Sequence, residues 1–423
     1  MSFSQRLEEI RTGFERPFWV ANISEIFERL AYYGAFAVLA NYLRETLSFP
    51  TEETGTLTGI FGGMVWFLAV FGGAVADKMG FRRALSVAYL ILAGAYFLLG
   101  SIGASWLGPV RNAVPLSLFV GFILILPALG ISLVKPCVVG TTARASKDNV
   151  RALGYSIYYT MVNIGGLLGP YAGSWTEHYL GPGKIFQIAA VATFLMFFFV
   201  LAFFREPKRI DNTPVPTVGE TLRNFLTVLG NPKFMIFLLI FSGYWVVFWQ
   251  QWIVMPIYLH QFVGKTIDVQ KILMTDSALV ITCTILLNQL TKKLPAFSAI
   301  ILGTFITSIS WLILALHPSM WGAVATIAVL AIGEIVHQPR YYEYVSRLAP
   351  EGQQGTYMGF AFVPLGIGSL VGGWFGGKVL HYFGEEMHRP EWTWFVIVGV
   401  GLVTTALLWI YDKIVKPGRA PAA

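Results

Sequence analysis

Three ionisable residues stand close together in the first long apolar segment of this 423-residue chain: Glu25, Glu28 and Arg29, in the run SEIFERLAYYG. On a helix, positions 25, 28, 29 and 32 share one face, so the phenol of Tyr32 joins the three charges. Such a group forms either a self-satisfied ion-pair cluster or a site that exchanges protons and holds a charged solute. We favour the second interpretation, because each charge within a membrane span costs roughly 2.5–3.5 kcal/mol on insertion scales and one acid is left over once Arg29 has taken a partner.

Further charges fall in two other apolar segments. Lys135 follows a long apolar run, where it either faces a cavity or extends to the membrane surface. The run LAIGEIVHQPRYYEYVSRLAP holds Glu334, His337, Arg340 and Glu343 at helical spacings of three. The pair Arg340 and Glu343 fits a surface contact and His337 fits a packing residue, whereas Glu334 lies deep in the apolar run and is a candidate for function.

The elements that must position these charges are membrane-spanning helices. The chain is 55% hydrophobic and only 13% charged, with a mean hydropathy of +0.63, which excludes an ordinary soluble domain. Segments of about 20 apolar residues, the length that crosses a bilayer as a helix, recur along its whole length. They predict an all-α integral membrane protein with twelve transmembrane helices near residues 18–43, 54–76, 84–106, 114–137, 151–175, 186–204, 233–259, 272–290, 296–316, 321–343, 355–377 and 392–412.

The loops between the spans predict orientation and domain organisation. An even number of spans puts both termini on one side, and the loops on that side carry most of the Lys and Arg residues, so both termini are expected to be cytoplasmic in a cell membrane. The Pro-rich, charged segment 205–232 divides the spans six from six. It predicts an N-terminal bundle over 1–204, a cytoplasmic linker over 205–232 and a C-terminal bundle over 233–423.

Composition also narrows the partners. The net charge of +7 is expected to face anionic lipid headgroups rather than nucleic acid. The two cysteines, Cys137 and Cys283, stand far apart in apolar segments and support neither a disulfide framework nor a metal site. We expect no cofactor, and a protein that functions as a monomer on a small-molecule substrate.

The loop between the second and third spans reads GGAVADKMGFRRAL and carries Gly73, Asp77, Gly80, Arg82 and Arg83 in the spacing G-x-x-x-D-x-x-G-x-R-R. Glycine permits a tight turn, and the Asp and Arg side chains can latch helix ends through charge and dipole. This spacing is more demanding than the positive-inside rule requires, and it predicts a gating or latch element.

This loop resembles the signature of the major facilitator superfamily, and EIFER resembles the ExxER motif of its proton-dependent oligopeptide transporter family. Similar runs include YYTMVNIGGLLGP at 158–170 and GEIVHQP in span ten. The resemblance implies two six-helix bundles and proton-coupled uptake of di- and tripeptides by alternating access. It implies proton coupling by Glu25, Glu28 and Arg29, and substrate contacts by Arg29, Tyr32, Tyr33, Lys135, Asn163 and Glu334, with a Lys135 to Glu334 contact that opens during transport.

The chain departs from that family at several positions. Gln250 and Gln251 stand where family members commonly carry a protonatable Glu in span seven, so coupling would be altered or moved to span one. Trp66 replaces a span-two tyrosine, and Trp66 and Gln250 are therefore expected to shape a different pocket. The linker is too short for the extra pair of helices of many bacterial members.

Other functions stay open on the sequence alone. A permease of the same fold could carry an amino acid, a modified peptide or an organic anion, with or without protons. A drug–proton antiporter would share the loop signature, although Arg29 and Lys135 disfavour cationic drugs. A membrane enzyme is disfavoured, because the buried charges are spread over spans one, four and ten rather than gathered in one catalytic constellation.

Overall fold

The computed structural model describes residues 12–147, 150–207, 218–349 and 354–415. Residues 1–11, and residues 208–217 of the predicted linker, lie outside the described residues. The described part is helical, and its one β-pairing is the single bridge Phe14–Ser146. The helices are α2 (Arg16–Asn41), α3 (Thr51–Met79), α4 (Phe81–Gly100), α5 (Gly108–Ala113), α6 (Leu116–Arg144), α7 (Arg151–Leu180), α8 (Lys184–Phe203), α9 (Val218–Leu229), α10 (Pro232–Phe248), α11 (Gln250–Tyr258), α12 (Val269–Thr291), α13 (Ala296–Leu316), α14 (Met320–Leu348), α15 (Gln354–Phe360), α16 (Val363–Leu380) and α17 (Trp392–Val415).

Several of these helices continue into short helical turns. The turns are η1 (Tyr42–Thr46) after α2, η2 (Ser105–Leu107) before α5, η4 (Leu259–Val263) after α11 and η5 (His381–Glu386) after α16. Helix starts follow local chemistry: the side chain of Asn231 accepts a hydrogen bond from the amide of Phe234 at 3.2 Å and so caps α10. Ser319 caps α14 in the same way.

The helices match the predicted spans. Nine helical segments of the described chain are long and apolar enough to cross a bilayer, and α3 makes a tenth if its two parts form one span. The helices α2 and α7 have 26 and 30 residues, which is sufficient length, but their polar residues lower their hydropathy. These two helices bring the total to the twelve predicted spans. In that total, α10 and α11 together form one span, and α15 and α16 together form another.

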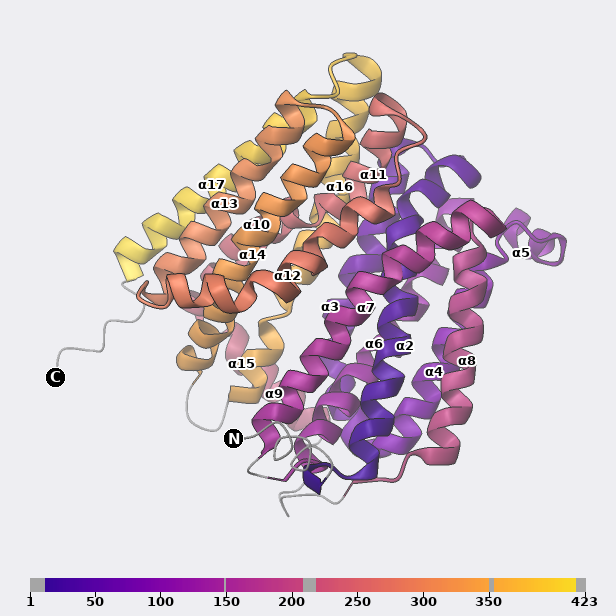
Figure 1. Ribbon diagram of the computed structural model, residues 1–423, viewed down its shortest axis with the longest axis vertical. Helices are drawn as coiled ribbons and strands as arrows, with labels where there is room; N and C mark the ends of the chain where they lie inside the picture. The colour runs from indigo at the N-terminus through magenta and orange to yellow at the C-terminus, as the bar shows by residue number, and fades with distance from the viewer. Residues whose placement is uncertain (1–11, 148–149, 208–217, 350–353, 416–423) are drawn as a thin grey trace. The chain divides into compact units, whose positions relative to one another are not determined.

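Two compact units are defined by contacts. Unit 1 comprises residues 1–38 and 68–219, and unit 2 comprises residues 39–67 and 220–423. In unit 1, α4 packs against both α6 and α8 (Figure 1). Phe14, Phe18, Ala145 and Val150 form a small hydrophobic cluster where the chain enters α2 and α7.

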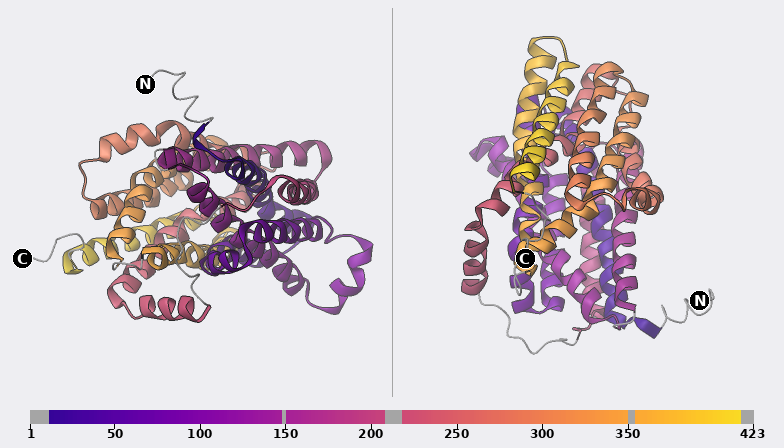
Figure 2. Two further views of the ribbon diagram at one scale, coloured as in Figure 1. Left: turned by 90° about the horizontal axis from the view of Figure 1, so that it is seen from below. Right: turned by 90° about the vertical axis from the view of Figure 1, so that its left-hand side faces the viewer.

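In unit 2, α13 packs against α14 and α17, and α14 packs against α12 (Figure 2). Aromatic side chains fill its centre: the rings of Trp311 and Trp394 stack with centroids 4.5 Å apart. A second group surrounds α10, where the ring of Phe241 stacks on Tyr341 at 4.4 Å. These contacts fix the positions of α10 and α14, which carry polar residues discussed below.

The start of α3 crosses α16 at glycines within unit 2. A Cβ atom added to Gly59 would lie 2.6 Å from the carbonyl oxygen of Ser369 and 2.9 Å from the Cα atom of Gly373. One added to Gly55 would lie 2.6 Å from the carbonyl oxygen of Gly373. Small residues let membrane helices approach to backbone contact, and the hydroxyl of Ser369 donates a hydrogen bond to the carbonyl of Gly59 at 3.1 Å.

Candidate functional site

The ion-pair cluster predicted on the first span is present on α2 and is buried. Glu25, Glu28 and Arg29 have side chains that are at most 1% exposed. The guanidinium of Arg29 donates to Glu28, and its Nε atom lies 3.5 Å from Oε1 of Glu25. Glu28 therefore takes the hydrogen bonds, whereas both carboxyl oxygens of Glu25 are buried without one. Arg29 thus pairs with both acids, and it holds Glu25 through the ion pair alone.

Lys135 of α6 completes this cluster in unit 1. It lies within electrostatic range of Glu25, Glu28 and Arg29, and it is partly exposed. The cluster thus contains two acidic and two basic groups, so it is neutral when all four are ionised.

Glycines on α7 allow α2 to come close. A Cβ atom added to Gly165 would overlap the Cβ atom of Arg29 and lie 3.2 Å from the carbonyl carbon of Arg29. One added to Gly169 would lie 2.8 Å from the Cβ atom of Tyr33 and 2.9 Å from the amide nitrogen of Gly34. These contacts give a physical reason for the glycines in the run YYTMVNIGGLLGP: they let α7 press Arg29 into place.

Two tyrosines lie against the charged cluster on α2. The Cζ atom of Arg29 lies 5.1 Å from the ring centroid of Tyr32 and 5.9 Å from that of Tyr33. Tyr32 is buried and Tyr33 is partly exposed. Asn163 of α7 is also partly exposed, and its amide donates to the carbonyl of Tyr159 at 2.8 Å. The cation–π geometry stabilises Arg29 in a dry environment.

The signature loop between α3 and α4 has the predicted turn. Gly80 precedes α4 with φ of 82°, a conformation that side chains disfavour. Asp77 forms an ion pair with Arg144 at the end of α6, at 3.0 Å. Arg82 donates to the carbonyl of Leu201 at 2.6 Å. The loop thus ties the ends of α3, α4, α6 and α8 in unit 1 together.

Sequence reasoning missed two partners of this loop, Arg144 and Glu206. The carboxylate of Glu206 accepts hydrogen bonds from the backbone amides of Phe81 and Arg82 at 2.8 and 2.9 Å, so it caps the start of α4. Of the remaining signature residues, Arg83 is exposed and a Cβ atom on Gly73 would only touch Pro136 at 3.7 Å. Neither Arg144 nor Glu206 stands at a fixed spacing from the motif. No local sequence pattern could therefore have predicted that they contact this loop.

Replacing Glu206 with alanine is expected to destabilise the protein by about 1 kcal/mol, because two amides at the start of α4 lose their acceptor and the helix dipole loses its counter-charge. Thermal unfolding in detergent measures this. The matched control is Glu206→Gln, whose amide oxygen still accepts a hydrogen bond and which should lose less than half as much. Equal loss in both variants would show that capping by an acceptor is not the cause.

The predicted residues of unit 2 are placed on α3, α11 and α14. Trp66 stacks on Phe362 with ring centroids 5.5 Å apart, which makes an aromatic wall from segments far apart in sequence. Gln250 is fully buried, and its amide donates to the carbonyls of Val246 and Gly372 at 2.6 and 3.2 Å. Those bonds hold α10 and α11 against α16.

Glu334 lies in the middle of α14, within electrostatic range of an acid that sequence reasoning missed, Asp276 of α12. The helices α12 and α14 pack against each other. His337 is buried, contacts the carbonyl of Gly333 through Nδ1 at 3.1 Å and packs beside Tyr244. Arg340 pairs with Glu343 at 2.8 Å, in keeping with a surface contact.

A second polar cluster of unit 2, also unforeseen, joins η1 and the start of α3 to η4 and η5. Arg44 and Thr51 donate to the carboxylate of Glu385, the former at 3.1 Å, and His381 contacts the same carboxylate at 2.7 Å. His260 contacts Glu45 at 2.7 Å. These interactions fasten residues 39–67 to the rest of unit 2.

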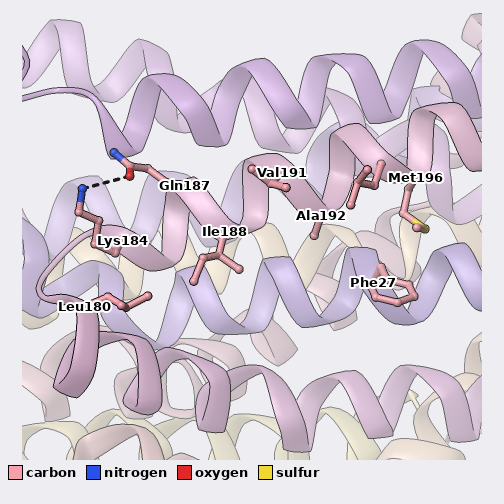
Figure 3. Close-up of a pocket in the computed structure, with 9 residues that line it drawn as sticks. Phe27, Leu180, Lys184, Gln187, Ile188, Val191, Ala192 and Met196 are labelled. Carbon is pink, nitrogen blue, oxygen red and sulfur yellow. Dashed lines mark hydrogen bonds between the residues drawn. The ribbon is translucent and has the colours of Figure 1, made fainter.

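One pocket of about 490 Å³ lies on unit 1, against α2 and between the end of α7 and α8 (Figure 3). Its lining is apolar apart from Lys184 and Gln187, which hydrogen-bond to each other at 3.2 Å at one end. The lining contains no acid and none of the predicted site residues. Many of its side chains are exposed, as on a surface that faces lipid acyl chains, and we assign the chemistry to the buried charges instead.

Comparison with known proteins gives a family model and full-length relatives. The model described as Major Facilitator Superfamily matches residues 22–363. Multidrug resistance protein MdtH of Escherichia coli is 22% identical over 387 residues, covering 91% of each chain. Multidrug resistance protein MdtH of Proteus mirabilis is 24% identical over 383 residues, covering 89% of each chain.

Solved structures share the fold at low identity. A POT family transporter in complex with 5-aminolevulinic acid has a TM-score of 0.78 and 16% identity, covering 94% of this chain and 96% of its own. The nucleoside transporter NupG (D323A mutant) also has a TM-score of 0.78, with 13% identity, covering 93% of this chain and 99% of its own. Peptide transporter POT in complex with sulfate reaches 0.74 at 18% identity, with 94% and 95% coverage. The predicted class, twelve helices in two six-helix bundles, is confirmed.

Proposed function

Because the chain belongs to the Major Facilitator Superfamily, we propose that it is a secondary active transporter that takes up di- and tripeptides together with protons. Membership makes it a multi-pass membrane protein and a solute transporter rather than an enzyme. The resemblance to the oligopeptide transporter family in the EIFER and signature motifs supports the choice of peptide, as does the fold shared with POT family structures.

The observation that carries the proposal is the neutral cluster formed by the buried Glu25, Glu28 and Arg29 together with Lys135. A peptide carboxylate that pairs with Arg29 or Lys135 would add a negative charge to a dry site, which is costly unless another acid is neutralised. Glu25 lacks hydrogen bonds to its carboxylate, so it is the acid that a proton neutralises most easily. Binding of the carboxylate and binding of a proton would therefore favour each other, which is the basis of symport.

The remaining predicted contacts complete the proposed substrate site. We assign the peptide amino group to Glu334 with Asn163, and the side-chain walls to Tyr32, Tyr33 and Trp66. Gln250 would shape the pocket through its helix contacts rather than by direct charge. The functional halves would be residues 1–204 and 233–423, joined by the cytoplasmic linker 205–232. Both termini would lie in the cytoplasm, and the protein would function as a monomer.

A second candidate function is drug–proton antiport. It is favoured by the relatives MdtH of Escherichia coli and Proteus mirabilis, which bear the name multidrug resistance protein and align over most of both chains. Acids within the spans, such as Glu25 and Glu334, would serve an exporter as proton sites equally well. Arg29 and Lys135 would repel a cationic drug, so this candidate requires a neutral or anionic drug.

Uptake of labelled dialanine into proteoliposomes with an imposed inward proton gradient tests the proposal. We expect accumulation above equilibrium that an ionophore abolishes. Equilibration that ignores the ionophore would indicate an uncoupled peptide carrier. Absence of uptake by folded, reconstituted protein would contradict the peptide assignment. The remaining alternative would then be a permease of the same fold for another solute. The next probes would be 5-aminolevulinic acid and an amino acid mixture.

A further inference from the structure

The pocket of unit 1 is a long groove. Its lining side chains stand in a row along α8, from Lys184 and Gln187 at one end to Met196 at the other, with Phe27 of α2 near the far end (Figure 3). Met196 comes twelve residues after Lys184, which on a helix corresponds to about 18 Å. Half the thickness of a bilayer's hydrocarbon core is about 15 Å. The groove therefore has the length of one lipid acyl chain that runs from the headgroup level to the middle of the bilayer.

The walls of the groove suit a hydrocarbon chain. Apart from the two polar residues at one end, all its lining side chains are apolar. Phe27, Leu180, Val191 and Leu195 are each between 40% and 60% exposed, whereas Met196 is buried. In a protein that spans a membrane, exposed apolar side chains of this kind face lipid. The concave volume of about 490 Å³ lets one chain contact several of them at once, which a flat helix face does not.

The polar end of the groove is positively charged. Lys184 is the first residue of α8, and its Nζ atom donates a hydrogen bond to Oε1 of Gln187 at 3.2 Å. The amide of Gln187 in turn donates to the carbonyl of Gly100 at 3.2 Å, which holds the pair in place. An ammonium group has three donors, so Lys184 has two more to offer to the oxygens of an anion. The start of a helix also favours an anion, and none of the described residues that line the groove is acidic.

Exposed aromatic residues indicate that this end lies at the level of the lipid headgroups. Trp175 and Tyr179, near the end of α7, are 48% and 67% exposed, and their ring centroids lie 5.4 Å apart. Exposed Trp and Tyr side chains gather at the interface between membrane and water. Leu180, which lines the groove, follows directly, and residues 181–183 then lead to Lys184. Lys184 thus stands where the phosphate groups of the lipids lie.

We propose that this groove binds one anionic phospholipid of the surrounding bilayer, with an acyl chain along α8 and the phosphate at Lys184. Phosphatidylglycerol has a net negative charge, whereas the ammonium group of phosphatidylethanolamine cancels the charge of its phosphate, so the first should bind better. Because Phe27 belongs to α2, the bound chain contacts both α2 and α8. The site goes beyond the proposed function and does not depend on which solute is transported.

Mass spectrometry of the intact protein in detergent, with equal amounts of dipalmitoyl phosphatidylglycerol and phosphatidylethanolamine, tests the site. Lys184→Gln removes the charge, and Leu195→Trp fills the groove. The matched controls are Lys265→Gln, an exposed lysine outside the groove, and Leu201→Trp, on α8 but outside the lining. Thermal unfolding without lipid checks that each variant is folded.

We expect the wild-type protein to retain phosphatidylglycerol about fivefold better than phosphatidylethanolamine, the ratio expected for one lysine near an anionic lipid. Lys184→Gln should lose this preference and Leu195→Trp should lose the bound lipid, whereas both controls should behave as the wild-type protein does. Equal retention of the two lipids by the wild-type protein would overturn the proposal and indicate ordinary boundary lipid. Undiminished retention by Leu195→Trp would overturn the placement of the chain in the groove.

The unfolding temperature gives a second measurement of the headgroup contact. A ligand that binds only the folded protein stabilises it, so added phosphatidylglycerol should raise the unfolding temperature of the wild-type protein more than that of Lys184→Gln. An equal rise in both would contradict the contact with Lys184. Neither measurement needs a transported peptide, so failure of dialanine uptake would overturn the proposed function and leave the lipid site standing.

Discussion

Replacing Arg29 with glutamine should abolish gradient-driven uptake and lower the free energy of unfolding by about 3–5 kcal/mol, the usual cost of breaking a buried ion pair. Arg29 is 1% exposed and serves both Glu25 and Glu28. Its loss leaves two buried acids opposite Lys135 alone. Uptake assays and unfolding in detergent measure the two effects separately.

The double variant Glu28→Gln with Arg29→Gln separates stability from function. It removes one charge of each sign, so the cluster stays neutral and much of the lost stability should return. Uptake should remain absent, because the proposed carboxylate ligand is gone. Uptake by Arg29→Gln at the wild-type level would show that the cluster is structural only.

Replacing Gly165 with leucine should reduce uptake more than tenfold and destabilise the protein by at least about 1–3 kcal/mol through overpacking. Any Cβ atom there would overlap the Cβ of Arg29 and crowd its carbonyl carbon, so α2 and α7 must separate. The charged cluster would then lose its geometry. The same uptake and unfolding assays apply.

Gly94 in α4 is the matched control for this change. It is also a helical glycine, but a Cβ atom at that position has nothing within 4 Å. Gly94→Leu should leave uptake and stability close to those of the wild-type protein. If both leucine variants behaved alike, the close crossing of α2 and α7 would not explain the loss.

The helical architecture was largely predictable, because apolar segments of bilayer length are a strong local signal. The cluster on α2 was predictable too, since Glu25, Glu28 and Arg29 lie within one turn of each other and charge in an apolar segment is rare. The helix α7 shows the limit of hydropathy, since its 30 residues form one helix without passing as an apolar span.

The partners of those residues were not predictable from one sequence. Asp276 stands 58 positions before Glu334 and Glu206 stands far beyond the signature loop, so only tertiary packing brings each pair together. The orientation of Lys135 was likewise open, because a lysine near a helix end either extends to the surface or turns inward. Local spacing contains no information on these choices.

Proton movement measured directly during peptide entry tests the central claim. Proteoliposomes with a pH-sensitive dye inside and no initial gradient are given dialanine outside, with Arg29→Gln as the inactive control. Symport predicts that the lumen becomes more acidic only with the wild-type protein and only after dialanine is added. If a drug is added instead and the lumen becomes more alkaline, the protein is an antiporter. An unchanged internal pH during peptide entry would contradict proton coupling.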